Sequence, residues 1–271
     1  MSDLSFPPAA AHGRYGIERQ RDGVRERAID ALAEEVPVAL SYNGVSHAVM
    51  LATPEHVEDF AVGFSLSECI VERPGEITDL EVLHRPLGIE VRMRIIGLRD
   101  AALRGRRRSL AGRTGCGLCG VESLEQLSPR VVSRDNDFVI AAAALPRALV
   151  ALGGMQALHR LTGAVHAAAW CGPDGELRLL REDVGRHNAL DKMIGALANG
   201  RRAFSDGFAL MTSRASYEIV QKAAAVGIPA VAAVSAPTGM AVRLAQEAGI
   251  TLVGFLRGDR HCVYSHPERV R

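Results

Sequence analysis

The sequence predicts an α/β protein, in which a mixed, largely parallel β-sheet is covered by helices and joined to an N-terminal part that contains β-hairpins. Two patterns lead to this prediction. From residue 176 onward, short apolar runs alternate with segments of helical periodicity, which is typical of parallel strands connected by helices. Residues 36–52 instead hold two apolar runs on either side of Asn43-Gly44, a dipeptide that favours the two-residue turn of a hairpin.

Composition and charge limit the classes of function. The chain has 271 residues, of which 48% are hydrophobic, enough for one large domain or two. Its 32 basic and 31 acidic side chains leave a formal net charge of +1, which gives no reason to expect a nucleic-acid or membrane partner. Five scattered cysteines, and a start without the apolar core of a signal peptide, favour a reducing compartment, so we expect a cytoplasmic protein.

We expect three segments along the chain. Residues 1–33 begin with proline, glycine and mixed charge and are predicted to form a loose tail. Residues 34–135 form a β-rich part that carries an arginine run and a CxxC sequence. Residues 136–271 form the α/β part. The second and third segments are predicted to make one continuous domain.

In the β-rich part, a helix is expected after the first hairpin. Thr53-Pro54-Glu55 combines a capping hydroxyl with a proline and an acid in the first helical turn. A second hairpin is predicted from residues 77–82 and 89–95. The apolar side chains that this helix is expected to bury are Val57, Phe60, Ala61, Phe64 and Leu66.

The α/β part begins with a predicted helix at residues 145–161 and a strand at residues 164–170. Its alternating pattern then continues to the end of the chain. The further predicted strands are 176–180, 208–212, 230–234 and 251–256, and the helices between them are 187–197, 217–226 and 239–248.

Polar loops follow the predicted strands, where open α/β sheets bind their ligands. Residues 181–188, 213–216, 235–239 and 257–260 combine arginines, small hydroxyl residues and helix starts, which suit phosphate groups. The chain has no P-loop and no GxGxxG sequence, so an ordinary ATP or NAD site is not expected. An alternative remains open, in which these polar residues only cap helices.

Histidines fall in two of these regions. His187 stands among Asp183, Arg186 and Asn188, which favours a functional role. His166 lies on an apolar strand, where we expect a hydrogen-bonded core histidine.

Cys116 and Cys119 form the CxxC, within the glycine-rich sequence GCGLCG. Residues 85–113 contain nine arginines against two acids, a local balance of +7, and nearby positive charge lowers the pKa of a thiol. Three interpretations remain open for the pair: sulfur or redox chemistry, half of a zinc site, and a structural role.

A zinc deaminase is a further alternative. His56-Val57-Glu58 matches the HxE half of that signature, and the CxxC matches the other half. Gly115 stands where the signature has proline, and a predicted hairpin separates the two halves, so this interpretation is the weaker one.

Several stretches together resemble the formate dehydrogenase accessory sulfurtransferase (FdhD) family. The three longest are residues 113–120, 182–192 and 254–260. Shorter agreement occurs at 52–54 with 58–64, at 162–163 with 166–168, and at 235–238. Ala164 departs from the pattern, because we expect glycine at that position.

The resemblance implies a sulfur carrier that takes persulfide sulfur from a cysteine desulfurase and passes it to the molybdenum cofactor for formate dehydrogenase. Cys116 falls on the persulfide cysteine, and Cys119 on its helper. The binding motif for bis(molybdopterin guanine dinucleotide) falls on Phe255, Leu256, Arg257, Gly258, Asp259 and Arg260.

The resemblance also implies a homodimer with a three-layer α/β/α fold, similar to cytidine deaminase but without catalytic zinc. To the cofactor-binding motif we add residues of the strand-end loops: Asp183, His187, Arg214, Ser235 and Thr238. A cofactor-binding chaperone that transfers no sulfur is the remaining alternative.

Overall fold

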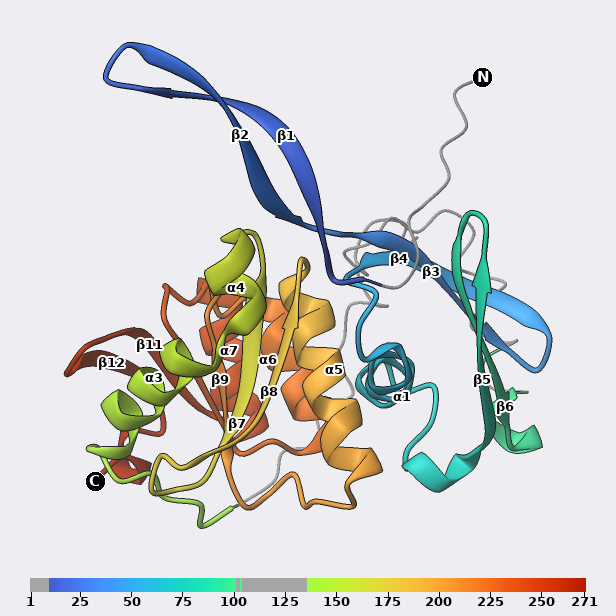
Figure 1. The fold of residues 1–271 in the computed structure, drawn as a ribbon. Helices are drawn as coiled ribbons and strands as arrows, with labels where there is room; N and C mark the ends of the chain where they lie inside the picture. Colours follow the sequence, from blue (N-terminus) through green and yellow to red (C-terminus); the bar gives the residue numbers. More distant parts are fainter. Residues whose placement is uncertain (1–9, 101–102, 104–135) are drawn as a thin grey trace.

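The computed structural model describes residues 10–100, 103 and 136–271 (Figure 1). A six-stranded sheet with strand order β12-β11-β10-β9-β7-β8 lies at the centre of the C-terminal part. Strands β9, β10 and β11 pair in parallel, and the other neighbouring pairs are antiparallel. The predicted mixed α/β class is therefore confirmed, and parallel pairing within this sheet involves three of its strands. The six strands are β7 (His166–Cys171), β8 (Leu177–Asp183), β9 (Phe208–Met211), β10 (Ala230–Ala233), β11 (Thr251–Arg257) and β12 (Arg260–Ser265).

Helices cover both faces of this sheet, because successive side chains of its strands point to opposite sides. Ala168 and Trp170 pack toward α5 (Arg186–Asn199), α6 (Tyr217–Val226) and α7 (Gly239–Ala248). Ala167 and Ala169 pack on the other face, toward α3 (Ala144–Met155). The helix predicted at 145–161 is interrupted at Gln156, and its second piece is α4 (Ala157–Thr162).

The N-terminal part contains a second sheet, with strand order β4-β3-β6-β5. Both predicted hairpins are present, as β3 (Val36–Tyr42) with β4 (Val45–Ala52), and as β5 (Ile77–Arg85) with β6 (Gly88–Ile95). Short 3-10 turns occur at η1 (Pro74–Glu76) and at η3 (Pro267–Arg269) near the C-terminus. Within the described ranges, every helix is too short or too polar to span a bilayer.

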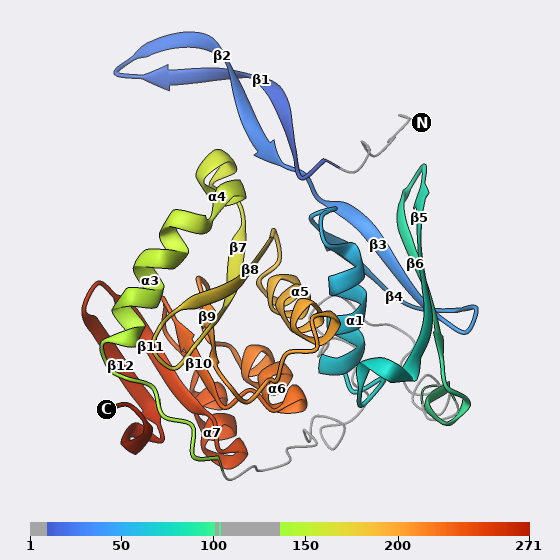
Figure 2. The ribbon, with the colours of Figure 1, turned by 60° about the horizontal axis from the view of Figure 1, so that its bottom comes forward.

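Helix α1 (Val57–Ser67) lies between the small sheet and α5 (Figure 2). The five apolar residues predicted for its buried face are all buried. A β-carbon on Gly63 would lie 1.7 Å from the backbone oxygen of Asp191, and one on Gly195 would lie 1.8 Å from that of Asp59. The two helices therefore touch backbone to backbone, and the same hydrophobic core extends through both parts.

The helix start predicted at Thr53 is wrong. Helix α1 begins at Val57, after His56 in a left-handed conformation with φ of 55°. The Thr53 side chain does not cap it, because its hydroxyl accepts a hydrogen bond of 3.1 Å from the backbone nitrogen of Val184. The Thr53 hydroxyl, which could have capped a helix, instead connects the two parts of the molecule.

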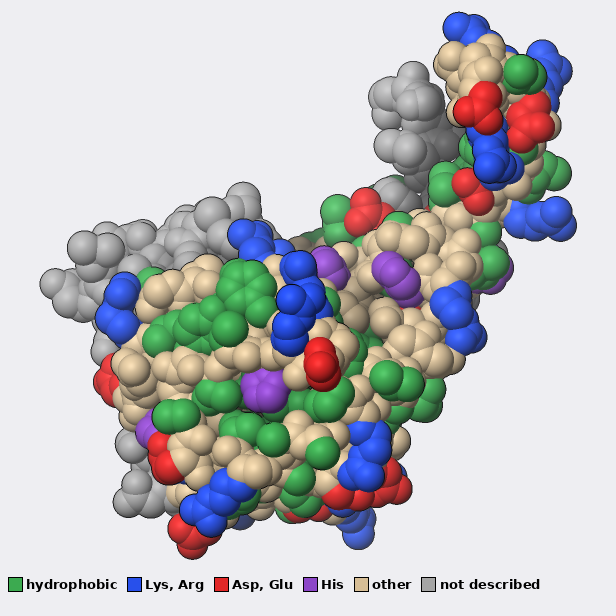
Figure 3. All heavy atoms as spheres, turned by 90° about the vertical axis from the view of Figure 1, so that its left-hand side faces the viewer, with side chains coloured by type: hydrophobic (Ala, Val, Ile, Leu, Met, Phe, Trp, Pro, Cys, Tyr) green, Lys and Arg blue, Asp and Glu red, His purple; other side chains and the backbone are tan. Residues whose placement is uncertain are grey.

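The loose tail predicted for residues 1–33 is wrong over residues 12–33. Strands β1 (His12–Arg21) and β2 (Val24–Ala33) form an antiparallel hairpin that reaches away from the rest of the molecule (Figure 1). Its projecting end carries charged side chains of both signs (Figure 3), including the pairs Arg19–Glu26 and Arg25–Glu18. Because both faces are in contact with water, the strands lack the apolar alternation that identifies a half-buried strand.

Candidate functional site

The polar loops come together at one edge of the large sheet. Strands β8, β9, β10 and β11 all run in the same direction. Strand β7 is antiparallel to both β8 and β9, and β10 is parallel to both β9 and β11. The backbone nitrogen of Thr238 donates to the oxygen of Ala215 (3.1 Å), and that of Phe255 donates to the oxygen of Ser235 (3.1 Å). Backbone hydrogen bonds thus link the loop after β9 to the loop after β10, and the loop after β10 to the end of β11, as their positions at one edge of parallel strands predict.

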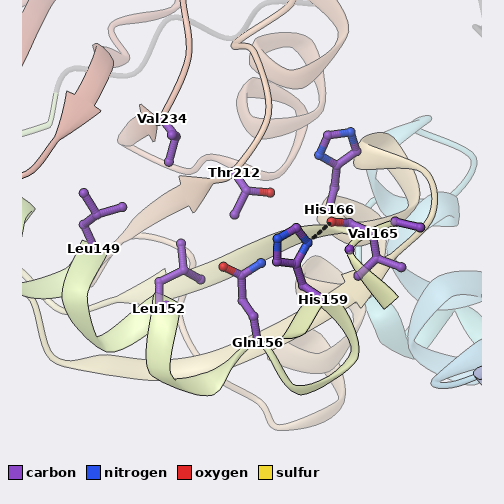
Figure 4. A pocket seen from close by; sticks show the side chains of 11 residues that line it. Leu149, Leu152, Gln156, His159, Val165, His166, Thr212 and Val234 are labelled. Atoms are coloured by element: carbon purple, nitrogen blue, oxygen red, sulfur yellow. Dashed lines mark hydrogen bonds between the residues drawn. The ribbon is translucent and has the colours of Figure 1, made fainter. Parts of the chain in front are cut away.

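A pocket of about 510 Å³ opens at this edge, between the α3–α4 pair and the sheet (Figure 4). The sheet contributes His166 at the start of β7, Thr212 after β9 and Val234 after β10. The described residues of the lining include no Asp, Glu, Lys or Arg. The remaining labelled side chains in the lining are Leu149, Leu152, Gln156, His159 and Val165.

His166 is a pocket residue and not the hydrogen-bonded core histidine that the sequence predicts. Its ring is half-buried, lines the pocket and forms no hydrogen bond with the residues described. Burial, together with the positive charge of Arg186, lowers the pKa of His166, so its ring is neutral at physiological pH. Ala164, the departure from the family pattern, also lines the pocket, and its φ is not positive, so the backbone accommodates alanine.

The predicted cofactor motif forms the turn between β11 and β12, where Arg257 pairs with Arg260. Phe255 is 41% exposed, with a positive φ of 51°, and Gly258 has φ of 58°. Arg257, Asp259 and Arg260 are exposed. Leu256 is completely buried against the α3 side of the sheet, so it anchors the turn and cannot contact a ligand directly.

Three exposed guanidinium groups stand at the same edge: Arg214, Arg257 and Arg260. None of them forms an ion pair within the described part of the chain. Thr238 is the helix cap that the alternative interpretation anticipates, because its hydroxyl accepts from the backbone nitrogen of Ala241 at the start of α7. Ser235 is half-buried beside the Phe255 backbone.

Asp183 belongs to the fold and not to a ligand surface. It is completely buried, and its Oδ2 lies 2.6 Å from Nζ of Lys192, which is also completely buried. The same carboxylate accepts hydrogen bonds from the backbone nitrogens of Thr53 (3.0 Å) and Gly185 (2.8 Å) and from Nδ2 of Asn188 (3.0 Å). With its oxygens occupied, Asp183 fastens the N-terminal part to the start of α5.

His187 lies just below this edge, with its side chain 13% exposed. Its Nε2 is 3.2 Å from Oε2 of Glu218, although the angles are not those of a hydrogen bond. Burial, aided by the charge of Arg186, lowers the pKa of His187 to about 3. Burial likewise raises the pKa of Glu218 to about 7. A neutral imidazole therefore faces a carboxyl group that holds its proton up to neutral pH.

A buried ionic cluster continues from Glu218 along α6. Nζ of Lys222 lies 2.8 Å from Oε1 of Glu68, 3.0 Å from Oδ2 of Asp191 and 3.1 Å from Oγ of Ser67. Sequence reasoning missed this cluster, and the available signal was a lysine on the apolar face of a predicted helix. Its members come from α1, α5 and α6, so the cluster joins the two parts of the molecule a second time.

The described arginines of the basic run are held in local ion pairs. Arg85 and Arg92 both bind Glu90, and Arg99 binds Glu76. Arg85, Arg92 and Arg94 are exposed, so this part of the run forms a charged surface. Arg104 to Arg113, Cys116 and Cys119 lie outside the described residues.

The other sulfur and metal candidates are placed as follows. Cys171 is completely buried, and burial raises the pKa of its thiol to about 12, whereas Cys262 is exposed on β12. Burial also lowers the pKa of His56. Among the residues that the structure describes, no three His, Cys, Asp or Glu side chains are grouped closely enough to hold a metal ion.

Known proteins match this chain over nearly its whole length. Sulfur carrier protein FdhD of Cupriavidus necator is 53% identical, over 100% of this chain and 96% of that protein. The protein of the same name from Bordetella petrii is 51% identical, over 89% of this chain and 87% of that protein.

The fold also matches a solved structure. The crystal structure of a candidate formate dehydrogenase accessory protein from Desulfotalea psychrophila has a TM-score of 0.77 and 24% identity. The match covers 97% of this chain and 100% of that chain, and it shows a shared fold. The FdhD/NarQ family model covers residues 33–271, which include the pocket, the β11–β12 turn and both cysteines of the CxxC. The resemblance deduced from the sequence is confirmed, and the chain belongs to the FdhD/NarQ family.

Proposed function

We propose that this protein is a sulfur carrier in which Cys116 receives persulfide sulfur from a cysteine desulfurase and delivers it to bis(molybdopterin guanine dinucleotide), for use by formate dehydrogenase. The main support for this proposal is the 53% identity, along the full chain, to a protein named sulfur carrier protein FdhD. The client follows from the description of the Desulfotalea psychrophila protein as a formate dehydrogenase accessory protein. A homodimer acting in the cytoplasm completes the proposal.

The donor step is a thiol–persulfide exchange. The Cys116 thiolate attacks the terminal sulfur of the desulfurase persulfide, a new S–S bond forms, and the donor S–S bond breaks to release the donor cysteine as a thiolate. The exchange involves no net oxidation and needs only that Cys116 is deprotonated. The arginines between residues 104 and 113 favour the thiolate by their charge, and Cys119 is the assisting thiol.

The acceptor end is supported by the chemistry of the sheet edge. A guanine dinucleotide cofactor carries pyrophosphate groups, which arginine recognises through paired N–H donors. Arg214, Arg257 and Arg260 are exposed there and have no ion-pair partner among the described residues. In this proposal the cofactor is the substrate that receives the sulfur.

Intact mass spectrometry tests the donor step. After incubation with a cysteine desulfurase and cysteine, the protein is expected to gain the mass of one sulfur atom, which a reductant removes. Cys116→Ala should gain nothing, and Cys262→Ala, which alters an exposed cysteine outside the CxxC, should gain the same mass as wild type. Absence of the adduct from the wild-type protein would refute the proposal.

Two further results would identify the alternatives. If Cys116→Ala restored formate dehydrogenase activity in a deficient host, the protein would be a cofactor chaperone that needs no sulfur transfer. If zinc copurified stoichiometrically and was lost in His56→Ala, the deaminase interpretation would be favoured.

A further inference from the structure

The β1–β2 hairpin (residues 12–33) forms a long arm, to which no third strand is added within the described ranges. Its ladder runs from the pair His12–Ala33 to the pair Arg21–Val24 without a bulge. The arm reaches away from both sheets (Figure 1). A hairpin of two strands is only marginally stable in water, and three or more strands with an apolar face are usually needed. We therefore expect a further strand to pair with this arm.

Strand β1 has an open edge. Natural proteins protect a free edge strand from other chains with proline, lysine or a bulge, and β1 contains none of these. The base of β2 is instead held by the body of the molecule, because Ala33 packs against the apolar cluster that contains Leu158 of α4. The strand of the arm that is most available to another chain is therefore β1.

The turn of the arm determines which backbone groups of β1 face outward. Asp22 and Gly23 have positive φ, 51° and 81°, and form the two-residue turn of a hairpin. Arg21 and Val24 are therefore a hydrogen-bonded pair, and such pairs alternate with non-hydrogen-bonded ones along the ladder. The even-numbered residues of β1 fall in the second kind of pair. Their N–H and C=O groups consequently point toward the open edge.

The side chains of β1 match a second copy of the same strand. When two β1 strands lie antiparallel with Gly16 opposite Gly16, the outward-facing backbone groups of one strand meet those of the other. Glu18 then lies opposite Arg14, and Tyr15 lies opposite Ile17. Each contact occurs twice because of the two-fold symmetry. Arg14 is exposed and forms no ion pair in the described part of the chain, so its guanidinium group is available for this contact.

The composition of the arm favours a copy of itself over other partners. Residues 12–33 contain five arginines and four Asp or Glu residues, so the arm has little net charge to attract a nucleic acid or an anionic membrane. Tyr15, Ile17 and Leu32 lie on one face of the ladder, and Tyr15 and Leu32 are exposed. A two-fold axis perpendicular to the sheet places the same face of both arms on one side. Pairing of two β1 strands thus extends this apolar face across both copies.

We propose that β1 pairs antiparallel with β1 of a second copy of this chain, with the two-fold axis at Gly16, so that the two arms form one continuous sheet. A β-carbon added to Gly16 would have nothing within 4 Å, so the axis is open to the second chain. This inference rests on the homodimer of the proposed function and assigns its interface. It does not depend on the sulfur chemistry of Cys116.

Analytical ultracentrifugation of the full chain tests this interface, with Gly16→Pro as the variant and Arg27→Pro as the matched control. Proline at position 16 removes an N–H that faces the open edge, so the hairpin keeps its own hydrogen bonds. Arg27 is opposite Glu18, so its N–H faces the other edge of the arm. We expect Gly16→Pro to weaken dimerisation at least about tenfold and Arg27→Pro to leave it unchanged. Circular dichroism should show the wild-type fold in both variants.

Charge reversal tests the register of the two strands. Arg14→Glu and Glu18→Arg each place like charges opposite one another at both ends of the interface, so each variant alone should dimerise about tenfold more weakly than wild type. An equimolar mixture of the two variants places opposite charges face to face again, and dimerisation should recover. Recovery on mixing requires contact between two chains, so it cannot arise from the folding of either variant.

Wild-type dimerisation in Gly16→Pro would overturn the inference and assign the homodimer to another surface, and a mixture that does not recover would also overturn it. A wild-type protein that sediments as a monomer at every concentration would refute the homodimer as well, and would leave the open edge to a strand of a different protein. Sulfur loading of Cys116, measured by intact mass, should be normal in Gly16→Pro. Failure of sulfur transfer can therefore be distinguished from failure of this interface.

Discussion

Replacing Asp183 with alanine distinguishes a residue of the fold from a residue of the ligand site. The change removes the counter-charge of Lys192, whose ammonium lies 2.6 Å from the carboxylate with neither side chain exposed. It also removes an acceptor from three donors: the buried Thr53 nitrogen, the buried Nδ2 of Asn188 and the half-buried Gly185 nitrogen. Three donors and one buried charge therefore lose a partner in a single substitution.

The structure sets the expected magnitude. Removing one partner of a buried ion pair costs about 3–5 kcal/mol, and each buried donor left unpaired adds about 1–3 kcal/mol. Lys192 limits the total, because burial lowers the pKa of its amine and the group can release its proton when Asp183 is absent. We therefore expect a loss of about 4 kcal/mol in the free energy of unfolding, a large share of the roughly 5–15 kcal/mol typical of a domain.

Urea unfolding followed by tryptophan fluorescence measures this loss, since Trp170 is the only tryptophan and is completely buried on β7. Asp183→Ala/Lys192→Met should recover most of the stability, because the unpaired charge is then gone. Asp259→Ala, in the exposed β11–β12 turn, should stay within about 0.5 kcal/mol of wild type. If Asp183→Ala kept the stability of wild type but bound GDP more weakly, Asp183 would be a residue of the ligand site and not of the fold.

Two other predictions concern the junction of the two parts. Because burial raises the pKa of Glu218 to about 7 from its usual 4.5, its contribution to stability is present below pH 4.5 and is lost as the pH rises through about 7. Relative to Glu218→Gln, wild type should lose up to about 3 kcal/mol between pH 4.5 and 7.5 in urea unfolding, and a constant difference would contradict the burial argument. Gly195→Ala places a methyl group 1.8 Å from the Asp59 backbone oxygen and should lower the free energy of unfolding by at least about 1–3 kcal/mol, measured by thermal unfolding. Gly16→Ala on β1, where an added β-carbon has nothing within 4 Å, should have little effect. Equal unfolding temperatures for the two variants would disprove the close approach of α1 and α5.

The helices predicted best are those whose ends are marked by neighbouring residues. Helices α6 and α7 have the predicted bounds, Tyr217–Val226 and Gly239–Ala248. Each follows a hydroxyl residue and ends at a glycine in the left-handed conformation, Gly227 or Gly249. Such signals are local and therefore visible in the sequence.

The elements predicted wrongly depend on tertiary structure or lack a buried face. Thr53 has the chemistry of a helix cap, but Val184 and Asp183 of the other part engage it. The β1–β2 hairpin lacks apolar alternation, although Asp22-Gly23, both with positive φ, carries the sequence of a tight turn. That dipeptide could have identified the hairpin.

The candidate site likewise has one part that the sequence predicts and another that depends on tertiary structure. Its loops could be predicted, because a polar segment after each parallel strand has a defined place at the sheet edge. The pocket could not, because it depends on a helix break at Gln156 that no proline marks, and on His159 and His166, which lie on either side of the Gly163 turn. The Lys222 cluster likewise exists only after α1, α5 and α6 have packed.

The start of α5 connects the fold to the site. Asp183 and Lys192 fasten Thr53 to this end of the helix, while Arg186 at its first turn acts on the pKa of His166 in the pocket. The N-terminal part, which leads along the chain to the CxxC segment, and the sheet edge are thus held by the same few residues. A substitution at the start of α5 affects both the N-terminal part and the sheet edge. If such a variant loses sulfur transfer, the loss can be assigned to chemistry only when the variant is shown to remain folded. Substitutions at Arg257 and Arg260, which are exposed in the β11–β12 turn and take no part in these contacts, therefore test the acceptor end of the transfer separately from the junction.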